Sequence, residues 1–135
     1  MNYIESEEFL KQPKTIQKVF EKWWTDNLQQ SDLVKLKLAR NKEKIQIIAN
    51  IDLACIEEGE IIPLFTEGQL RKFIEDKSRC KNVEISGDIE TGQYYADFYE
   101  EIYSGIEIDT IENLGTDKFK AYWTLALIFV KEEIK

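Results

Sequence analysis

The residues best equipped for chemistry are carboxylates that crowd into one part of the chain. Between Asn82 and Asp117 there are ten acidic residues and no lysine or arginine, and we call this stretch the acidic segment. Carboxylates bind hard cations, transfer protons and attract surfaces of opposite charge. Five of them are the candidate site residues, namely Asp97, Glu100, Glu101, Glu107 and Asp109.

Three interpretations of the acidic segment remain open. The first is a solvated surface that keeps the protein soluble. The second is a docking surface for a basic protein, which in its extreme form mimics the phosphates of DNA as some phage inhibitors do. The third is a metal or catalytic site, but alternate side chains such as Glu107 and Asp109 lie about 6.6–6.8 Å apart on a strand and point in parallel. Because no metal motif is present, the favoured functional interpretation is docking on a basic surface.

The rest of the composition argues against most enzyme chemistries. The chain has no histidine, which removes the commonest general base and the usual transition-metal ligand. It has no glycine-rich nucleotide motif and no EF-hand loop. Its two cysteines, Cys55 and Cys80, lack the CxxC spacing of zinc sites and are expected to be free, with Cys55 in a buried strand. We therefore expect a non-enzymatic protein without cofactor or metal, the alternative being a small ligand-binding or carboxylate-dependent enzymatic domain.

Length and charge bound the class of protein. With 135 residues, 43% apolar and 33% charged, the chain is expected to form a single domain, residues 1–135. A net charge of −8 argues against direct nucleic-acid or anionic-membrane binding, because both need clustered lysine and arginine. The start "MNYIESEEFL" has no basic region typical of a signal peptide. The apolar run 121–130 is too short for a membrane span, so we expect a cytoplasmic protein.

The first element expected to organise the chain is a helix that begins at Pro13, where a missing N–H costs nothing. An apolar stripe follows at helical spacing, formed by Ile16, Val19, Phe20, Trp23 and Trp24. The two tryptophans have two interpretations. They pack in the core, or one of them is partly exposed as a contact for a partner.

Strand patterns come next. Leu36 and Leu38 alternate with lysines, and Ile45, Ile47 and Ala49 alternate later, which predicts a hairpin that turns at residues 40–42. A second strand pair is predicted at residues 53–56 and 61–65, where Pro63 favours an edge strand.

The stretch "IIPLFTEGQLRKFIED" is interpreted as a junction between a strand and a helix. Thr66 and Gln69 match the capping box at a helix start, and Glu67 suits the positive end of the helix dipole. A ligand-binding loop is the alternative interpretation.

The second half predicts a strand at 83–85, a strand at 106–111, and a final helix at 116–133. Residues 93–103 fit either a helix or a strand, and their aromatic richness favours a strand. The final helix is long and apolar nearly all round, so either the tryptophan helix covers it or a homodimer forms through it. The fold class is therefore α+β, with a mixed or mainly antiparallel sheet and about three helices.

Three segments carry a resemblance to known proteins: "VFEKWW", "IPLFTEGQLRKFIEDK" and "KAYWTLALIFVKEE". They resemble small uncharacterised proteins encoded by phages and prophages of Gram-positive bacteria, over about half of the chain. The resemblance implies a genomic setting in which a short accessory protein binds and redirects a host or phage protein. It supplies no catalytic residue, because the shared motifs are a helix stripe, a cap and a core helix.

Overall fold

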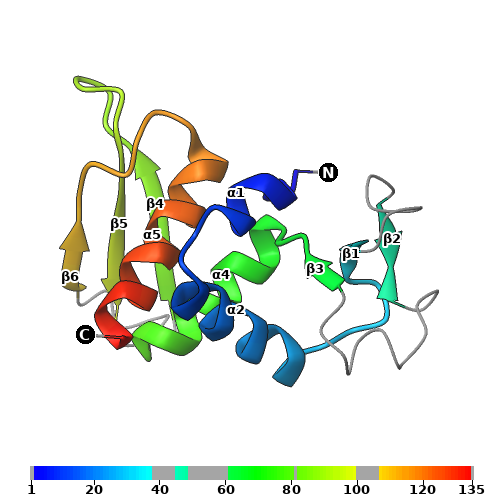
Figure 1. Cartoon of the computed structure of the whole chain (residues 1–135). Helices are drawn as coiled ribbons and strands as arrows, with labels where there is room; N and C mark the ends of the chain where they lie inside the picture. The colour runs from blue at the N-terminus through cyan, green and yellow to red at the C-terminus, as the bar shows by residue number, and fades with distance from the viewer. Residues whose placement is uncertain (1, 38–44, 49–60, 81, 100–106, 135) are drawn as a thin grey trace. The chain divides into compact units, whose positions relative to one another are not determined.

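The computed structural model describes the whole chain except residues 1, 38–44, 49–60, 81, 100–106 and 135 (Figure 1). In the described part the chain is α+β, as expected, with strands that pair only in antiparallel fashion in two three-stranded sheets. It divides into two compact units, Tyr3–Thr66 and Glu67–Lys135. The helices are α1 (Ser6–Leu10), α2 (Lys14–Asp26), α4 (Glu67–Ser78) and α5 (Lys118–Glu133). The strands are β1 (Leu33–Leu36), β2 (Gln46–Ile47), β3 (Ile61–Pro63), β4 (Asn82–Gly87), β5 (Tyr94–Tyr99) and β6 (Glu107–Ile111).

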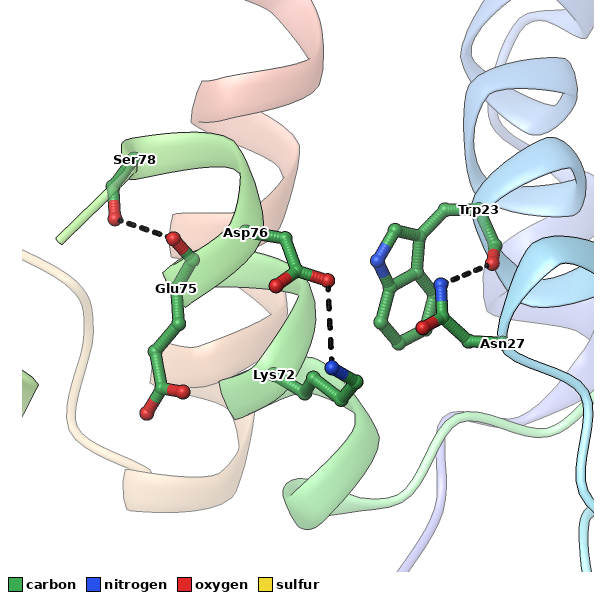
Figure 2. A network of polar contacts seen from close by, with 6 residues as sticks. All are labelled: Trp23, Asn27, Lys72, Glu75, Asp76 and Ser78. Atoms are coloured by element: carbon green, nitrogen blue, oxygen red, sulfur yellow. Dashed lines mark hydrogen bonds and ion pairs between the residues drawn. The ribbon is translucent and has the colours of Figure 1, made fainter. Parts of the chain in front are cut away.

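The core of the first unit forms around α2. This helix begins at Lys14, one residue later than predicted, and Pro13 occupies the preceding N-cap position. Trp23 and Trp24 are both buried, which confirms the core interpretation of the tryptophan pair. The side-chain amide of Asn27 closes the end of the helix by donating a hydrogen bond to the Trp23 carbonyl oxygen at 2.8 Å (Figure 2).

Aromatic rings join α1, α2 and the chain after β3 within the same unit. The Phe65 ring centroid lies 5.5 Å from that of Phe20 and 6.1 Å from that of Phe9. All three side chains are fully buried. Rings at these separations attract one another beyond their burial, so this cluster anchors the short helix α1, which the sequence did not predict.

The sheet of the first unit has the strand order β2–β1–β3. Leu33 pairs with Ile47, which confirms the predicted pairing of these two stretches. Pro63 lies on an edge strand of the described sheet, as predicted. The predicted alternation of apolar inner and charged outer side chains is wrong within β1, because Lys35 is buried while Leu36 is partly exposed. The predicted turn at 40–42 and the predicted strand at 53–56 lie outside the described residues.

In the second unit α4 and α5 lie side by side and run in the same direction (Figure 1). Helix α4 begins directly after Thr66, where the sequence placed its cap. Helix α5 begins after Asp117, whose side chain accepts a hydrogen bond from the Lys120 backbone N–H at 2.9 Å. Arg71 bonds to Tyr122 near the starts of the two helices, and Lys77 pairs with Glu133 near their ends.

The sheet of the second unit has the order β4–β5–β6, and the ambiguous stretch 93–103 forms a strand over Tyr94–Tyr99. One side of this sheet is buried and packs toward the helices. Phe98 and Phe129 of α5 meet edge to face, with centroids 5.6 Å apart. Among the side chains of the sheet that the structure describes, the buried ones are Val83, Ile85, Ala96 and Phe98.

Two smaller expectations concern the cysteines and the membrane. Cys80 is buried and carries a free thiol, whereas Cys55 lies outside the described residues. Within the described part of the chain, no helix has the length and apolar character needed to cross a bilayer.

Candidate functional site

The site begins with a row of three side chains across the sheet of the second unit. Glu84 of β4 is the register partner of Asp97 of β5, and Asp97 is in turn the partner of Thr110 of β6. Side chains alternate between the two faces of a strand, and the neighbours of Glu84 and Asp97 along their strands are buried. Both carboxylates therefore lie on the opposite side, which we call the outer face.

Thr110 fixes the position of one carboxylate in this row. Its hydroxyl donates a hydrogen bond to Oδ1 of Asp97 at 2.9 Å. A carboxylate accepts about four hydrogen bonds through its two oxygens, so Asp97 keeps capacity for a further donor. Glu84 is exposed and Asp97 is partly exposed, so a partner can reach both.

Two tyrosines flank Asp97 along β5. Tyr95 and Tyr99 lie two residues before and after it, on the same face and about 6.4–6.8 Å away along the strand. Both side chains are partly exposed. Tyrosine is enriched in protein interfaces because its ring supplies apolar area and its hydroxyl supplies a polar group. The outer face therefore combines carboxylates with aromatic rings.

A tight hairpin holds this register. Asp88 donates its backbone N–H to the Gln93 carbonyl at 2.9 Å, and Gly92 donates to the Asp88 carbonyl at 2.8 Å. Gly92 has a φ of +72°, a conformation that glycine adopts without strain. Since a slip of one residue would move every side chain to the other face, this turn is what keeps Glu84 opposite Asp97.

Every charged side chain of the acidic segment is an acid. Ion pairs join Lys11 to Glu8, Arg71 to Glu67, Lys72 to Asp76 and Lys77 to Glu133, and none of these four pairs includes a described residue of the acidic segment. Like charges directly opposite each other on neighbouring strands destabilise a sheet. The Glu84–Asp97 pair is therefore an unfavourable feature of the isolated protein that a cation could relieve.

The five predicted site residues do not share one place in the structure. Asp97 lies on the outer face. Asp109 is exposed and pairs with Phe98, so its register position alternates with that of Asp97, and its Oδ1 accepts the Thr110 backbone N–H at 2.8 Å. Glu107 belongs to β6 and pairs with Tyr99. Glu100 and Glu101 lie outside the described residues.

The carboxylates that the structure describes do not form a metal site. Among those residues, no group of three or more cysteine, aspartate or glutamate side chains could hold an ion.

A hollow lies where α4 and α5 end. It has a volume of about 460 Å³, and its lining residues are Asp76, Lys77, Arg79, Phe129, Glu132 and Glu133. Its charges already neutralise one another in part, because Lys77 pairs with Glu133 at 2.9 Å and Lys72 reaches Asp76 at 3.8 Å (Figure 2). None of the four ion pairs given above compensates Glu84 or Asp97, so among the described residues the outer face is the stronger candidate.

The sequence pattern alone missed Glu84, Tyr95, Tyr99 and Thr110 as members of the site. The signal for them was the period-two alternation of "NVEISG" and "YYADFY", which places every second residue on one face. Their alignment across strands depends on register, and register is set by the hairpin turn.

Comparisons of the chain with protein-family models, with curated proteins and with solved structures found no match. The functional argument therefore rests on the outer face itself.

Proposed function

We propose that this is a non-enzymatic binding protein that docks on a basic surface of another protein through the outer face of the β4–β5–β6 sheet. The observation that supports this proposal most directly is the Glu84–Asp97 pair. These two carboxylates belong to residues directly opposite each other on neighbouring strands, within a segment that has no lysine or arginine. The resemblance of the sequence suggests the setting, namely a phage or prophage accessory protein that acts on a host protein in the cytoplasm.

The physical support is electrostatic and steric together. A surface of one sign accelerates encounter with a partner of opposite sign and disfavours partners of like sign. The tyrosines beside Asp97 add contact area that charge alone does not supply. Docking a cation on this face also removes the repulsion between the paired carboxylates.

The test starts with affinity capture from host lysate, followed by binding kinetics with the captured protein. The key variant carries Glu84→Gln and Asp97→Asn, the two acids of the outer face. The matched control carries the same number of neutralised charges in the first unit, at Glu5 and Glu7. We expect the key variant to associate more slowly, and the control to associate nearly as fast as the unaltered protein.

Salt provides the second readout. The Debye length falls from about 30 Å at 0.01 M salt to about 10 Å at 0.1 M, so the association rate should drop across that range. Equal binding by both variants, with no effect of salt, would mean that the acidic segment is only a solvated surface.

A further inference from the structure

We propose that the Asp109 carboxylate protects the outer edge of β6 and prevents this strand from pairing with the β6 strand of a second copy of the chain. The edge of the sheet is distinct from its outer face, so this role of Asp109 does not depend on the proposed function.

Strand β6 lies at one end of its sheet. Among the described strands it ends the order β4–β5–β6 and pairs with β5 (Figure 1). An edge strand presents a row of backbone N–H and C=O groups that can pair with another chain. Asp109 is exposed and Thr110 is partly exposed, so solvent reaches the middle of β6. Another strand can therefore add at this edge unless something blocks it.

The backbone of β5 shows which of its residues face β6. Tyr94 donates its N–H to the Gly115 carbonyl at 2.7 Å and accepts from the Leu114 N–H at 2.9 Å. Its backbone groups therefore point toward the side of the sheet where β6 lies. Every second residue of a strand shares this direction, so Ala96 and Phe98 also direct their backbone groups toward β6.

The register then shows which residue of β6 faces outward. Ala96 pairs with Ile111 and Phe98 pairs with Asp109, so these two residues of β6 direct their backbone groups toward β5. Thr110 lies between them and directs its N–H and C=O the opposite way, beyond the edge of the sheet. An added strand would use this N–H as a donor.

The side chain of Asp109 already occupies that donor. Its Oδ1 accepts the Thr110 backbone N–H at 2.8 Å. The Thr110 hydroxyl donates to Oδ1 of Asp97 at 2.9 Å, which ties the same residue to β5. An added strand must break the hydrogen bond from Thr110 to Asp109 before it forms its own, so it gains little at this position.

Charge adds to the protection against a second copy. Strand β6 contains Glu107 and Asp109, and the acidic segment around it has no lysine or arginine. Two copies of β6 side by side would bring charges of one sign together, which destabilises paired strands. Pairing of β6 with itself about a two-fold axis gives a closed dimer, so the assembly that Asp109 prevents is a dimer.

The experiment measures self-association of the full chain by sedimentation velocity over a range of protein concentrations. Asp109→Ala removes both the acceptor and the charge, whereas Asp109→Asn keeps an acceptor oxygen. We expect Asp109→Ala to self-associate about tenfold more tightly than the unaltered protein, because one edge N–H is released in each copy. Asp109→Asn should lie closer to the unaltered protein than to Asp109→Ala.

Glu112→Ala is the matched control. Glu112 is an exposed acid directly after β6, so the variant loses the same charge without releasing the Thr110 N–H. Its self-association should match that of the unaltered protein. Circular dichroism checks that each variant keeps the fold.

Hydrogen exchange at the Thr110 amide locates the contact. In Asp109→Ala this amide should exchange faster than in the unaltered protein at low protein concentration, because its acceptor is gone. It should exchange more slowly as the protein concentration rises and the edges pair.

Tighter self-association of Asp109→Ala with protection of the Thr110 amide supports the proposed role. A variant that associates no more than the unaltered protein, or whose association leaves this amide unprotected, overturns it. Equal association by Asp109→Ala and either Glu112→Ala or Asp109→Asn also overturns it, because loss of charge alone would then account for the change. Each of these results leaves docking through Glu84 and Asp97 untouched.

Discussion

The hydroxyl of Tyr122 accepts a hydrogen bond from Nη2 of Arg71 at 2.9 Å, and this contact joins the early turns of two helices that run in the same direction. Tyr122 is buried, whereas Arg71 is exposed at its other edge. The hydrogen bond raises the pKa of Arg71 above its usual value, with help from nearby Glu67 and Glu75. The guanidinium therefore stays charged at every pH at which the protein is handled.

Tyr122→Phe should destabilise the second unit by about 0.5–1.5 kcal/mol, the usual net value of one hydrogen bond. The stacking of Arg71 on the ring is kept in this variant, which limits the loss. Denaturant unfolding measures the change. Lys72→Gln is the control, because its pair with Asp76 is exposed and spans 3.8 Å, so it should change stability by less than about 0.5 kcal/mol. A larger effect from Lys72→Gln than from Tyr122→Phe would contradict the assigned role of the buried contact.

Asp117→Ala should destabilise the protein by about 0.5–2 kcal/mol, because it removes the side-chain cap at the start of α5. Asp117→Asn keeps an acceptor oxygen at the cap and should restore most of the loss. Thermal unfolding of the two variants checks this. Equal losses for alanine and asparagine would show that the negative charge near the helix start, not the hydrogen bond to Lys120, carries the effect.

Thr66→Ala should also destabilise the fold, by about 0.5–2 kcal/mol, since Thr66 directly precedes α4. Binding to a captured partner, measured under conditions where the variant is folded, should be unchanged. Loss of binding at unchanged stability would show that residues 65–69 form a contact loop and are not merely a junction.

Glu84→Gln should stabilise the isolated protein by about 0.2–1 kcal/mol, because it removes one of two like charges directly opposite each other. The gain should shrink as salt is added, since ions screen exposed charges. Chemical denaturation at two salt concentrations gives both quantities. Glu90→Gln should stay within about 0.5 kcal/mol of the unaltered protein, and an equal gain there would point to net charge instead of the specific pair.

The sequence predicted the elements better than their pairing. Helical spacing of Ile16, Phe20 and Trp23 located α2 within one residue, because a buried stripe leaves a strong periodic signal. Strand alternation located β4 and β6 as well. It failed at Lys35, which is buried, because burial in a short strand depends on neighbours far along the chain.

The candidate site was predictable only in part. The excess of acids in the acidic segment pointed to Asp97 and Asp109. Composition does not tell which acids lie side by side on neighbouring strands. Glu84 is 13 residues from Asp97 in sequence, and only the register of the β4–β5 hairpin brings them together. The tyrosines join the site by the same route, because Tyr95 and Tyr99 share a face with Asp97 only once 94–99 is a strand.

The packing of Phe98 against Phe129 has a consequence for synthesis of the protein. The β4–β5 hairpin forms from neighbours in sequence, but Phe129 belongs to α5, which the ribosome makes later. Until α5 has emerged, the hairpin lacks one of the two helices that pack on its apolar side. The nascent second unit therefore presents Phe98 and its neighbours to chaperones or to other chains, and slow translation of residues 118–133 should increase aggregation.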